Sequence, residues 1–204
     1  MMKHQQIVAI CGLIGSGKDT VADILVSEYR FIKLSFAGIL KDVVSILFGW
    51  DREMIEGGTP ESRVWREIED PYWTVKLGKP TSPRSVLQMI GTDIMRNHLH
   101  KNIWILALEK KVDDLVRDGK NIVFTDCRFA NEFEFLRSKG GIVVRIERGN
   151  KPNWWYDYVE RGMEPTGVHI TEWGWINEPY DKYLNNDGTI IELKSKLRIF
   201  EERI

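Results

Sequence analysis

The sequence has little cysteine, almost no net charge and no long apolar run. Its formal net charge is −1, so no global field favours nucleic acid or an anionic membrane. Only two cysteines occur, Cys11 and Cys127, each at the end of a predicted buried strand, which indicates reduced thiols rather than a disulfide. The N-terminal region contains no stretch typical of a signal peptide or membrane span. We therefore expect a cytoplasmic protein that binds neither nucleic acid nor membrane.

Apolar runs typical of buried strands alternate with helical patterns along the chain. The runs fall at Ile7–Cys11, Phe31–Leu34, Asn121–Thr125, Ile142–Ile146 and about Lys182–Asn185. The helical patterns between and after them cover about Lys18–Tyr29, Gly38 to Gly49, a stretch from Pro83, Ile103–Arg117, Ala130–Ser138 and a stretch from Thr189. This alternation predicts a three-layer α/β/α fold around a five-stranded parallel sheet.

Two segments rich in glycine and proline interrupt the alternation. Residues 50–80 carry a short helical stretch near Glu61–Ile68, which is typical of an inserted subdomain. Residues 148–179 show no clear helix or strand, and a loop of that length is usually a lid or a binding loop. We expect one domain over residues 1–204, with an insertion at about 50–80 and a mobile lid at about 148–176.

The most specific motif joins the first strand to the first helix. Gly12, four further residues, Gly17 and Lys18 match the phosphate-binding loop G-x-x-x-x-G-K. The glycines let backbone N–H groups and the helix N-terminus point at one anion, and Lys18 adds a positive charge. Asp19 stands where a Mg²⁺-binding Ser or Thr is usual, and Thr20 follows it. The spacing predicts a site for a nucleoside triphosphate.

A second polar constellation lies on the helix that begins at Ser82, the predicted N-cap, and Pro83. Arg84 and Gln88 are four residues apart and so share one helix face, and Gly91 allows a close backbone approach. Arginine can bind a phosphate with two hydrogen bonds, and a glutamine amide can read a base edge. A solvated polar face is the alternative. The apolar period predicts a buried face of Val86, Leu87, Ile90 and Ile94.

A third constellation follows the apolar strand at 121–125. Asp126 ends the strand, Arg128 follows at the sheet edge where ligands bind in open α/β folds, and Glu132 lies one helical turn further. A carboxylate in this position can serve Mg²⁺ or an acceptor group in phosphate-loop enzymes. A surface pair between Asp126 and Arg128 is the alternative.

The lid segment offers cations and aromatic side chains. Cations on a mobile segment suit phosphoryl transfer, because the transferred oxygens carry spread negative charge. The cations are Arg145, Arg148, Lys151 and Arg161, and the aromatic cluster is Trp154-Trp155-Tyr156. The cluster could stack on a base or form a dry contact with the body of the protein. A metal pair of His169 and Glu172 is disfavoured, because no third ligand stands at a suitable spacing.

These segments together resemble the bacteriophage deoxynucleoside monophosphate kinases, a branch of the phosphate-loop kinases. The resemblance is carried by Gly-Ser-Gly-Lys-Asp-Thr (15–20), Phe-Ala-Gly…Leu-Lys-Asp (36–42), Arg84…Gln88…Gly91-Thr92-Asp93, Trp104, Asp126-Cys-Arg128…Glu132, His169-Ile-Thr-Glu172 and Asn-Asn-Asp-Gly-Thr (185–189). It implies transfer of the γ-phosphoryl group of ATP to the 5′-phosphate of a deoxynucleotide for DNA precursor synthesis, with Mg²⁺, in the host cytoplasm.

The resemblance also implies roles for residues. The nucleotide-binding set is Gly12, Gly15, Ser16, Gly17, Lys18, Asp19, Thr20, Asn186 and Gly188, with Mg²⁺ held through water by Asp19 and Thr20. The acceptor set is Phe36, Lys41, Arg84, Gln88, Gly91, Thr92 and Trp104. The insertion at about 50–80, which follows the second strand, is also expected to bind the acceptor. The catalytic set is Lys18, Asp126, Arg128 and Glu132, and the lid arginines are Arg148 and Arg161.

Two other functions stay open at this level. One is a kinase for another phosphorylated acceptor, such as dephospho-coenzyme A or phosphomevalonate, although Gln88 as a base reader argues against it. The other is a non-catalytic nucleotide-binding protein. The sequence is compatible with a homodimer and does not state which bases are accepted.

Overall fold

The computed structural model describes residues 6–198, which fall into two compact units. The first unit comprises the chain up to Ser35 and from Glu109 onward, and the second comprises Phe36–Leu108. None of the helices within residues 6–198 has the length and apolar character that a bilayer crossing requires.

A five-stranded, all-parallel sheet forms the centre of the first unit. Its strands are β1 (Ile7–Cys11), β2 (Ile32–Leu34), β3 (Ile122–Phe124), β4 (Ile142–Glu147) and β5 (Lys182–Asn185). They lie in the order β2-β3-β1-β4-β5, so the strand that precedes the glycine-rich loop is central. The predicted parallel sheet is confirmed, and no strand end differs from its prediction by more than one residue.

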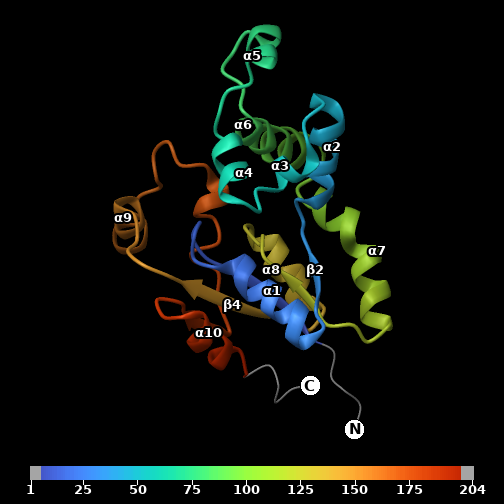
Figure 1. Cartoon of the computed structure of the whole chain (residues 1–204), viewed down its shortest axis with the longest axis vertical. Helices are drawn as coiled ribbons and strands as arrows, with labels where there is room; N and C mark the ends of the chain where they lie inside the picture. Colours follow the sequence, from blue (N-terminus) through green and yellow to red (C-terminus); the bar gives the residue numbers. More distant parts are fainter. Residues whose placement is uncertain (1–5, 199–204) are drawn as a thin grey trace. The chain divides into compact units, whose positions relative to one another are not determined.

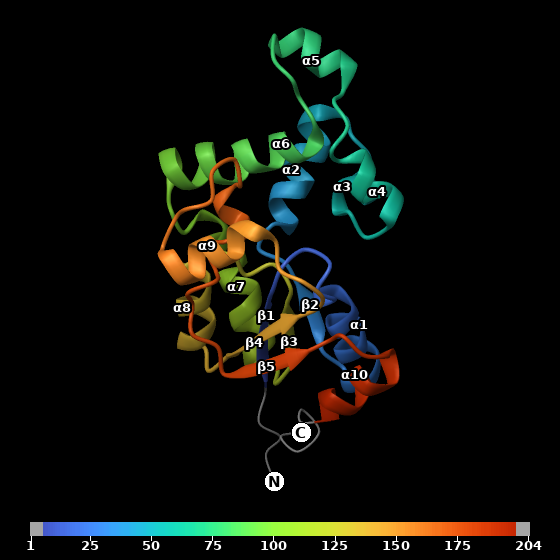
Figure 2. The same ribbon diagram turned by 90° about the vertical axis from the view of Figure 1, so that its left-hand side faces the viewer.

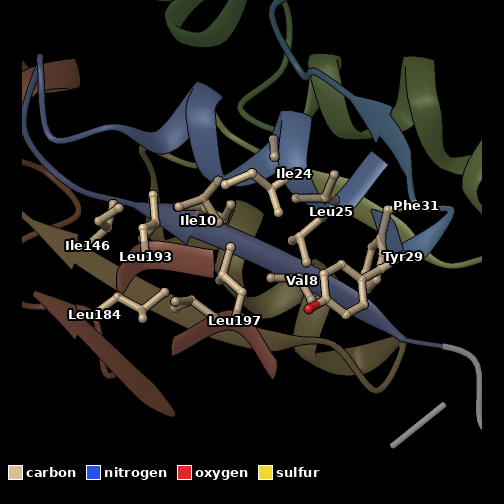
Figure 3. Close-up of a cluster of buried hydrophobic side chains, with 14 residues drawn as sticks. Val8, Ile10, Ile24, Leu25, Tyr29, Phe31, Ile146, Leu184, Leu193 and Leu197 are labelled. Carbon is tan, nitrogen blue, oxygen red and sulfur yellow. The ribbon is translucent and has the colours of Figure 1, made fainter. Parts of the chain in front are cut away.

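One face of the sheet is covered by α1 (Lys18–Tyr29) and α10 (Ile190–Leu197), as Figure 1 shows. Figure 3 shows the side chains that fill this layer, with Val8 and Ile10 of β1 between Leu25 of α1 and Leu197 of α10. Full burial of such a side chain contributes about 1.5–3 kcal/mol. This apolar contact fixes α1, and with it the loop at 12–18, against the carboxyl end of β1.

The opposite face is covered by α8 (Ala130–Ser138) and by the part of α7 (Ile103–Arg117) that belongs to this unit (Figure 2). Lys139, just after α8, pairs with Asp113 of α7 at 2.6 Å. The first unit therefore has the predicted three layers of helices, sheet and helices.

The second unit is helical throughout. It contains α2 (Gly38–Phe48), α3 (Arg52–Glu56), α4 (Pro60–Trp65), α5 (Pro71–Leu77), α6 (Pro83–Gln88), the π-helix η1 (Met89–Leu99) and the start of α7. Aromatic rings join the end of α2 to the chain that follows it. The Phe48 ring centroid lies 4.6 Å from that of Trp50 in a stacked pair and 4.7 Å from that of Trp73 of α5 in a tilted pair. The unit extends beyond the insertion predicted at 50–80, because α2, α6 and η1 fold with it.

The helix that begins at Ser82 changes its winding in the middle. Ser82 and Ser85 form the expected capping box, and Pro83 occupies the first turn. From Met89 the chain continues as a π-helix, whose wider turn rotates later side chains away from the α-helical face. The prediction that Ile94 is buried is therefore wrong: its side chain is 46% exposed, whereas Val86 is 1% exposed.

The prediction that residues 148–179 lack regular structure is wrong over part of the segment. They contain α9 (Asn153–Arg161) and the short 3₁₀ helix η2 (Ile170–Glu172). Pro152 takes the N-cap position of α9 and supplies no capping side chain, so the usual start signal is missing. The helix is held instead by aromatic contacts, with the Trp155 ring 5.7 Å from that of Trp175.

Candidate active site

The loop between β1 and α1 forms a phosphate cradle at the carboxyl end of the central strand. Gly12, Gly15 and Gly17 all have positive φ, which lets the chain turn tightly before the first turn of α1. A β-carbon at Gly12 would lie 2.3 Å from the Ile146 carbonyl oxygen, so only glycine fits against β4. The amides of this turn precede a helix N-terminus, which favours an anion.

Lys18 supplies a cation whose charged form is destabilised by its surroundings. Its Nζ donates to the carbonyl oxygens of Gly12 and Leu13, each at 2.9 Å. Burial, together with the nearby Arg128 guanidinium, lowers the pKa of Lys18 from 10.5 to about 8. Asp19 and Glu172 act in the opposite direction. An incoming polyphosphate would relieve the repulsion between the two cations, and this arrangement therefore favours anion binding.

Ser16 presents a buried hydroxyl to the same cradle. Its Oγ has no hydrogen-bond partner among the described residues, although the side chain is 2% exposed. The Ser16 carbonyl oxygen accepts a hydrogen bond of 2.9 Å from Nδ2 of buried Asn186, which follows β5. Asn186, predicted to bind the nucleotide, thus stabilises the loop through its backbone, and a contact with nucleotide stays a prediction. A free buried hydroxyl in a loop of this shape is suited to a phosphate oxygen.

Asp126 lies at the carboxyl end of β3, as predicted, and is half-buried. Ser35, directly after the neighbouring strand β2, donates a 2.7 Å hydrogen bond from Oγ to Asp126 Oδ2. Sequence reasoning missed Ser35. The rule that ligands gather at the carboxyl ends of parallel strands could have identified it, because it is the first polar residue after β2.

Arg128 and Glu132 are brought together by the turn that starts α8. The Glu132 carboxylate is 2% exposed and accepts hydrogen bonds from the backbone N–H groups of Arg128 (2.7 Å) and Phe129 (3.2 Å). It therefore fixes the backbone from which the Arg128 side chain extends. The guanidinium Nη1 of Arg128 donates to the Thr171 carbonyl oxygen at 2.7 Å and lies 3.4 Å from Glu172 Oε1.

Asp19, Thr20 and Gly188 lie near the cradle in more exposed positions. The Asp19 carboxylate pairs with Lys33 at 2.9 Å, and Thr20 is exposed in the first turn of α1. Gly188 lies beside the capping box of α10, where an added β-carbon would meet the Glu192 carboxylate at 2.1 Å. Its position thus serves the start of α10, and contact with nucleotide stays a prediction.

Both cysteines lie in the first unit, and both are free and buried. Burial raises the pKa of Cys11 to about 12 and that of Cys127 well above its ordinary value. The expectation of free thiols rather than a disulfide agrees with these positions.

Every residue of the predicted acceptor set falls in the second unit. Arg84 and Gln88 follow one another by four residues on α6, and both are half-buried. Arg84 Nη1 lies 3.4 Å from Glu67 Oε1, and its backbone N–H donates to the Arg66 carbonyl oxygen. Thr92 is half-buried on η1. This part of α6 and η1 can offer a cation and an amide to a phosphorylated ligand.

The other four members of that set have defined structural surroundings. Trp104 is buried and donates from Nε1 to the Gly91 carbonyl oxygen at 2.9 Å. A β-carbon at Gly91 would lie 2.6 Å from Leu40, so glycine is required where η1 meets α2. Phe36 is 2% exposed, and Lys41 pairs with Glu56. Phe36 and Trp104 therefore build the unit, and a direct contact with substrate stays a prediction for both.

The cations of the predicted lid differ in their surroundings. Arg148 and Arg161 are exposed, and Arg161 pairs with Asp157 along α9 at 2.8 Å. Lys151 pairs with Glu147 at 2.6 Å. Arg145 belongs to β4 and is enclosed by aromatic rings, so its assignment to a mobile lid is wrong: strand pairing fixes its backbone.

The sequence disfavours a metal pair of His169 and Glu172, and in the structure His169 has a structural role. His169 caps η2, with Nδ1 accepting from the Thr171 N–H at 3.3 Å. No cluster of three or more His, Cys, Asp or Glu side chains suited to a metal is present in residues 6–198.

The sequence is similar to those of known proteins. Residues 59–197 match the sequence profile of the deoxynucleotide monophosphate kinase family. A protein of Acanthamoeba polyphaga mimivirus, provisionally named for that activity, is 34% identical over 200 residues, covering 94% of this chain and 93% of the relative. The deoxynucleotide monophosphate kinase of Escherichia phage RB69 is 25% identical over 255 residues, covering 94% and 98%.

A more distant likeness exists to a solved structure. The dephospho-CoA kinase from Campylobacter jejuni is 14% identical, with a TM-score of 0.47 and 98% of each chain covered. That likeness is too distant to select one acceptor over another.

Proposed function

Since the chain belongs to the deoxynucleotide monophosphate kinase family, we propose that it transfers the γ-phosphoryl group of ATP to a deoxynucleoside 5′-monophosphate. The observation that carries the proposal is the cradle at 12–18, where Lys18 and Arg128 repel each other and Ser16 offers a buried hydroxyl. Such an arrangement is stabilised by a bound polyanion. The products are ADP and the deoxynucleoside diphosphate.

The residues of the first unit act by positioning and charge. The loop amides and Lys18 bind the β- and γ-phosphates, and Arg128 neutralises charge on the transferred group. Glu132 holds the Arg128 backbone, and Ser35 orients the Asp126 carboxylate toward the reacting groups. No covalent intermediate is required, because alignment and electrostatic stabilisation account for most catalysis of phosphoryl transfer.

Magnesium is the metal that the family implies. A nucleotide-bound Mg²⁺ takes only one or two protein oxygens and fills its remaining positions with phosphates and water. Asp19 and Thr20 directly follow Lys18, and Asp126 follows β3, the strand next to β1. These oxygens fit that requirement, so a larger acidic cluster is unnecessary. When bound, Mg²⁺ neutralises charge on the β- and γ-phosphates.

The second unit holds the acceptor in this proposal. Arg84 binds the 5′-phosphate, and Gln88, on the same face of α6, contacts the base edge. Because Arg84 and Gln88 are four residues apart on α6, one ligand could contact both side chains. Arg148 and Arg161, the exposed cations of the segment at 148–176, supply positive charge to the phosphates when the segment is closed.

The test is direct. The purified protein is incubated with ATP, Mg²⁺ and a panel of deoxynucleoside and ribonucleoside monophosphates, with dephospho-coenzyme A and phosphomevalonate as alternatives, and products are separated by chromatography. We expect diphosphates from one or more deoxynucleotides. Product from dephospho-coenzyme A alone would assign a different kinase. ATP binding without product from any acceptor would indicate a non-catalytic nucleotide-binding protein.

A further inference from the structure

Glu172 brings a negative charge into a site that is otherwise arranged for anions. Its side chain is 15% exposed, and Oε1 lies 3.4 Å from Arg128 Nη1. The Glu172 carboxylate also interacts with Lys18: it stabilises the charged form of Lys18, whereas Arg128 destabilises that form. The proposed catalysis assigns this carboxylate no role, and it would repel an incoming triphosphate.

The turn that carries Glu172 is held by hydrogen bonds and packs against the Arg128 backbone. His169 caps η2, and the Trp175 indole N–H donates to the Glu172 carbonyl oxygen at 3.0 Å. A β-carbon at Gly174 would lie 3.2 Å from the Arg128 carbonyl oxygen, so the two backbones are in close contact. The position of Glu172 is therefore set by the fold and does not result from a flexible side chain that happens to lie nearby.

Arg128 has two different partners in this turn. Its Nη1 donates to the Thr171 carbonyl oxygen at 2.7 Å, which is a good hydrogen bond, and reaches the Glu172 carboxylate only at 3.4 Å. The first contact orients the guanidinium, whereas the second is a looser ion pair. A phosphate oxygen can replace the carboxylate without breaking the bond to Thr171.

We propose that Glu172 is a positioning residue that acts as an internal counter-ion: it pairs with Arg128 in the nucleotide-free protein and is displaced by the phosphates of ATP. This inference rests on the proposed function, because it takes ATP as the ligand of the cradle. The carboxylate keeps two neighbouring cations compensated when no phosphate is bound. It also weakens nucleotide binding, which favours release of the product ADP.

The proposal predicts that removing the charge tightens nucleotide binding. In Glu172→Gln the shape is kept and the competing carboxylate is lost, so ATP and ADP should each bind about fivefold more tightly in calorimetry without acceptor. The matched control is Glu134→Gln, which removes the same charge from an exposed position on α8 of the same unit and should leave affinity near that of the unmodified protein. A merely structural role for Glu172 would give unchanged or weaker binding, and that result would overturn the proposal.

A double-mutant cycle with Arg128→Ala identifies the partner. Without Arg128 the effect of Glu172→Gln should shrink, because the ion pair that the phosphates must open no longer exists. An undiminished effect would overturn the assigned pairing. A crystal structure of the unmodified protein with a non-hydrolysable ATP analogue requires no variant to fold. It should show Arg128 on a phosphate oxygen and the pair with Glu172 opened beyond about 4 Å. A closed pair in that complex would also overturn the proposal.

These results separate the inference from the function on which it rests. If the unmodified protein binds no ATP, the proposed function fails. If it binds ATP, and Glu172→Gln binds it no more tightly than Glu134→Gln, only the counter-ion role of Glu172 fails.

Discussion

Asn186 Nδ2 donates a 2.9 Å hydrogen bond to the Ser16 carbonyl oxygen, although the two residues lie 170 positions apart in the sequence. Asn186 is 5% exposed and its backbone N–H also donates to Glu147, so β4 and β5 together carry the support for the phosphate-binding loop. The amide nitrogen would lie 2.3 Å from a β-carbon at Gly17. The shape of the loop therefore depends on a contact with the last strand.

The first prediction concerns Asn186→Ala. Loss of a buried hydrogen bond leaves the Ser16 carbonyl oxygen unsatisfied and should lower the free energy of unfolding by about 1–2 kcal/mol. The KM for ATP should rise more than the acceptor KM, because the loop loses its support. Chemical denaturation and steady-state kinetics measure the two effects. Asn150→Ala, at an exposed loop position, is the control and should change neither.

A second prediction compares two glycines of the same loop. Gly15 and Gly17 both have positive φ, so alanine strains the backbone at either position. Only at Gly17 does the new β-carbon also meet Asn186, whereas nothing lies within 4 Å of it at Gly15. Gly17→Ala should therefore raise the KM for ATP more and lower the melting temperature more than Gly15→Ala. Equal losses in the two variants would show that backbone strain alone matters.

The sequence predicted those parts of the fold that depend on local patterns. Gly49 ends α2 in a left-handed conformation, and Ser82 and Thr189 cap α6 and α10 where their sequence patterns indicate. The π-helix after Gln88 has no local sequence pattern that predicts it, and one of its carbonyl oxygens, that of Gly91, accepts a hydrogen bond from the Trp104 indole outside the helix. A period of 3.6 residues does not hold along this helix, and it places Ile94 on the wrong face.

The candidate site was predictable to the extent that a motif or a strand end marks it. Lys18 and Asp126 follow from the glycine-rich loop and from the end of β3. Glu172 and Thr171 lie more than 40 residues from Arg128, in the stretch at 148–179 whose sequence shows no clear helix or strand pattern. Their contact arises from tertiary packing, which one sequence does not contain.

A third prediction concerns the pH dependence of nucleotide use. The pKa of Lys18 is lowered to about 8 by burial and by Arg128, with Asp19, Glu172 and Cys11 acting against them. In the free protein Lys18 therefore loses its proton as the pH rises through about 8, and kcat/KM for ATP should fall by up to about tenfold per pH unit above it. Arg128→Ala removes repulsion and should move this limb to higher pH.

The same shift has a consequence for stability, with a sign that can be checked. The folded-state pKa of Lys18 lies below the unfolded value of 10.5, so the unfolded chain binds more protons between pH 8 and 10.5. The contribution of Lys18 to the free energy of unfolding should therefore rise with pH across that window. Lys18→Met should lose this rise in a pH series of denaturation curves, and Lys120→Met, at an exposed position, should keep it.

A fourth prediction tests the role of the second unit. Arg84→Ala should raise the KM for the acceptor by about tenfold or more, because a charge-assisted contact to its phosphate is lost, and should change the KM for ATP little. Lys76→Ala removes an exposed cation from α5 of the same unit and should leave both constants unchanged. A raised KM for ATP with an unchanged KM for the acceptor would show that Arg84 serves the ATP site and not the acceptor site.

The last prediction concerns which part of the segment at 148–176 moves. The Arg145 guanidinium lies 5.1 Å from the Trp155 ring centroid, 5.4 Å from that of Trp175 and 5.3 Å from that of Tyr180. Its Nη1 also donates to the Ile176 carbonyl oxygen at 3.3 Å. Because β4 holds Arg145, both α9 and the chain after η2 are tied to the sheet, which supports the dry-contact interpretation of the aromatic cluster.

Hydrogen exchange should therefore differ between α9 and the residues that follow it. Amides of α9 should be protected with or without nucleotides, whereas exposed residues 162–167 should gain protection only when both nucleotides bind. Arg145→Gln removes the cation from three aromatic contacts, each worth about 0.5–2 kcal/mol, and should expose α9 to exchange in the empty protein. Arg161→Gln removes an exposed cation from α9 itself and should not. If α9 gains protection on nucleotide binding as strongly as 162–167 does, the whole segment closes as one body and the aromatic contact does not anchor it.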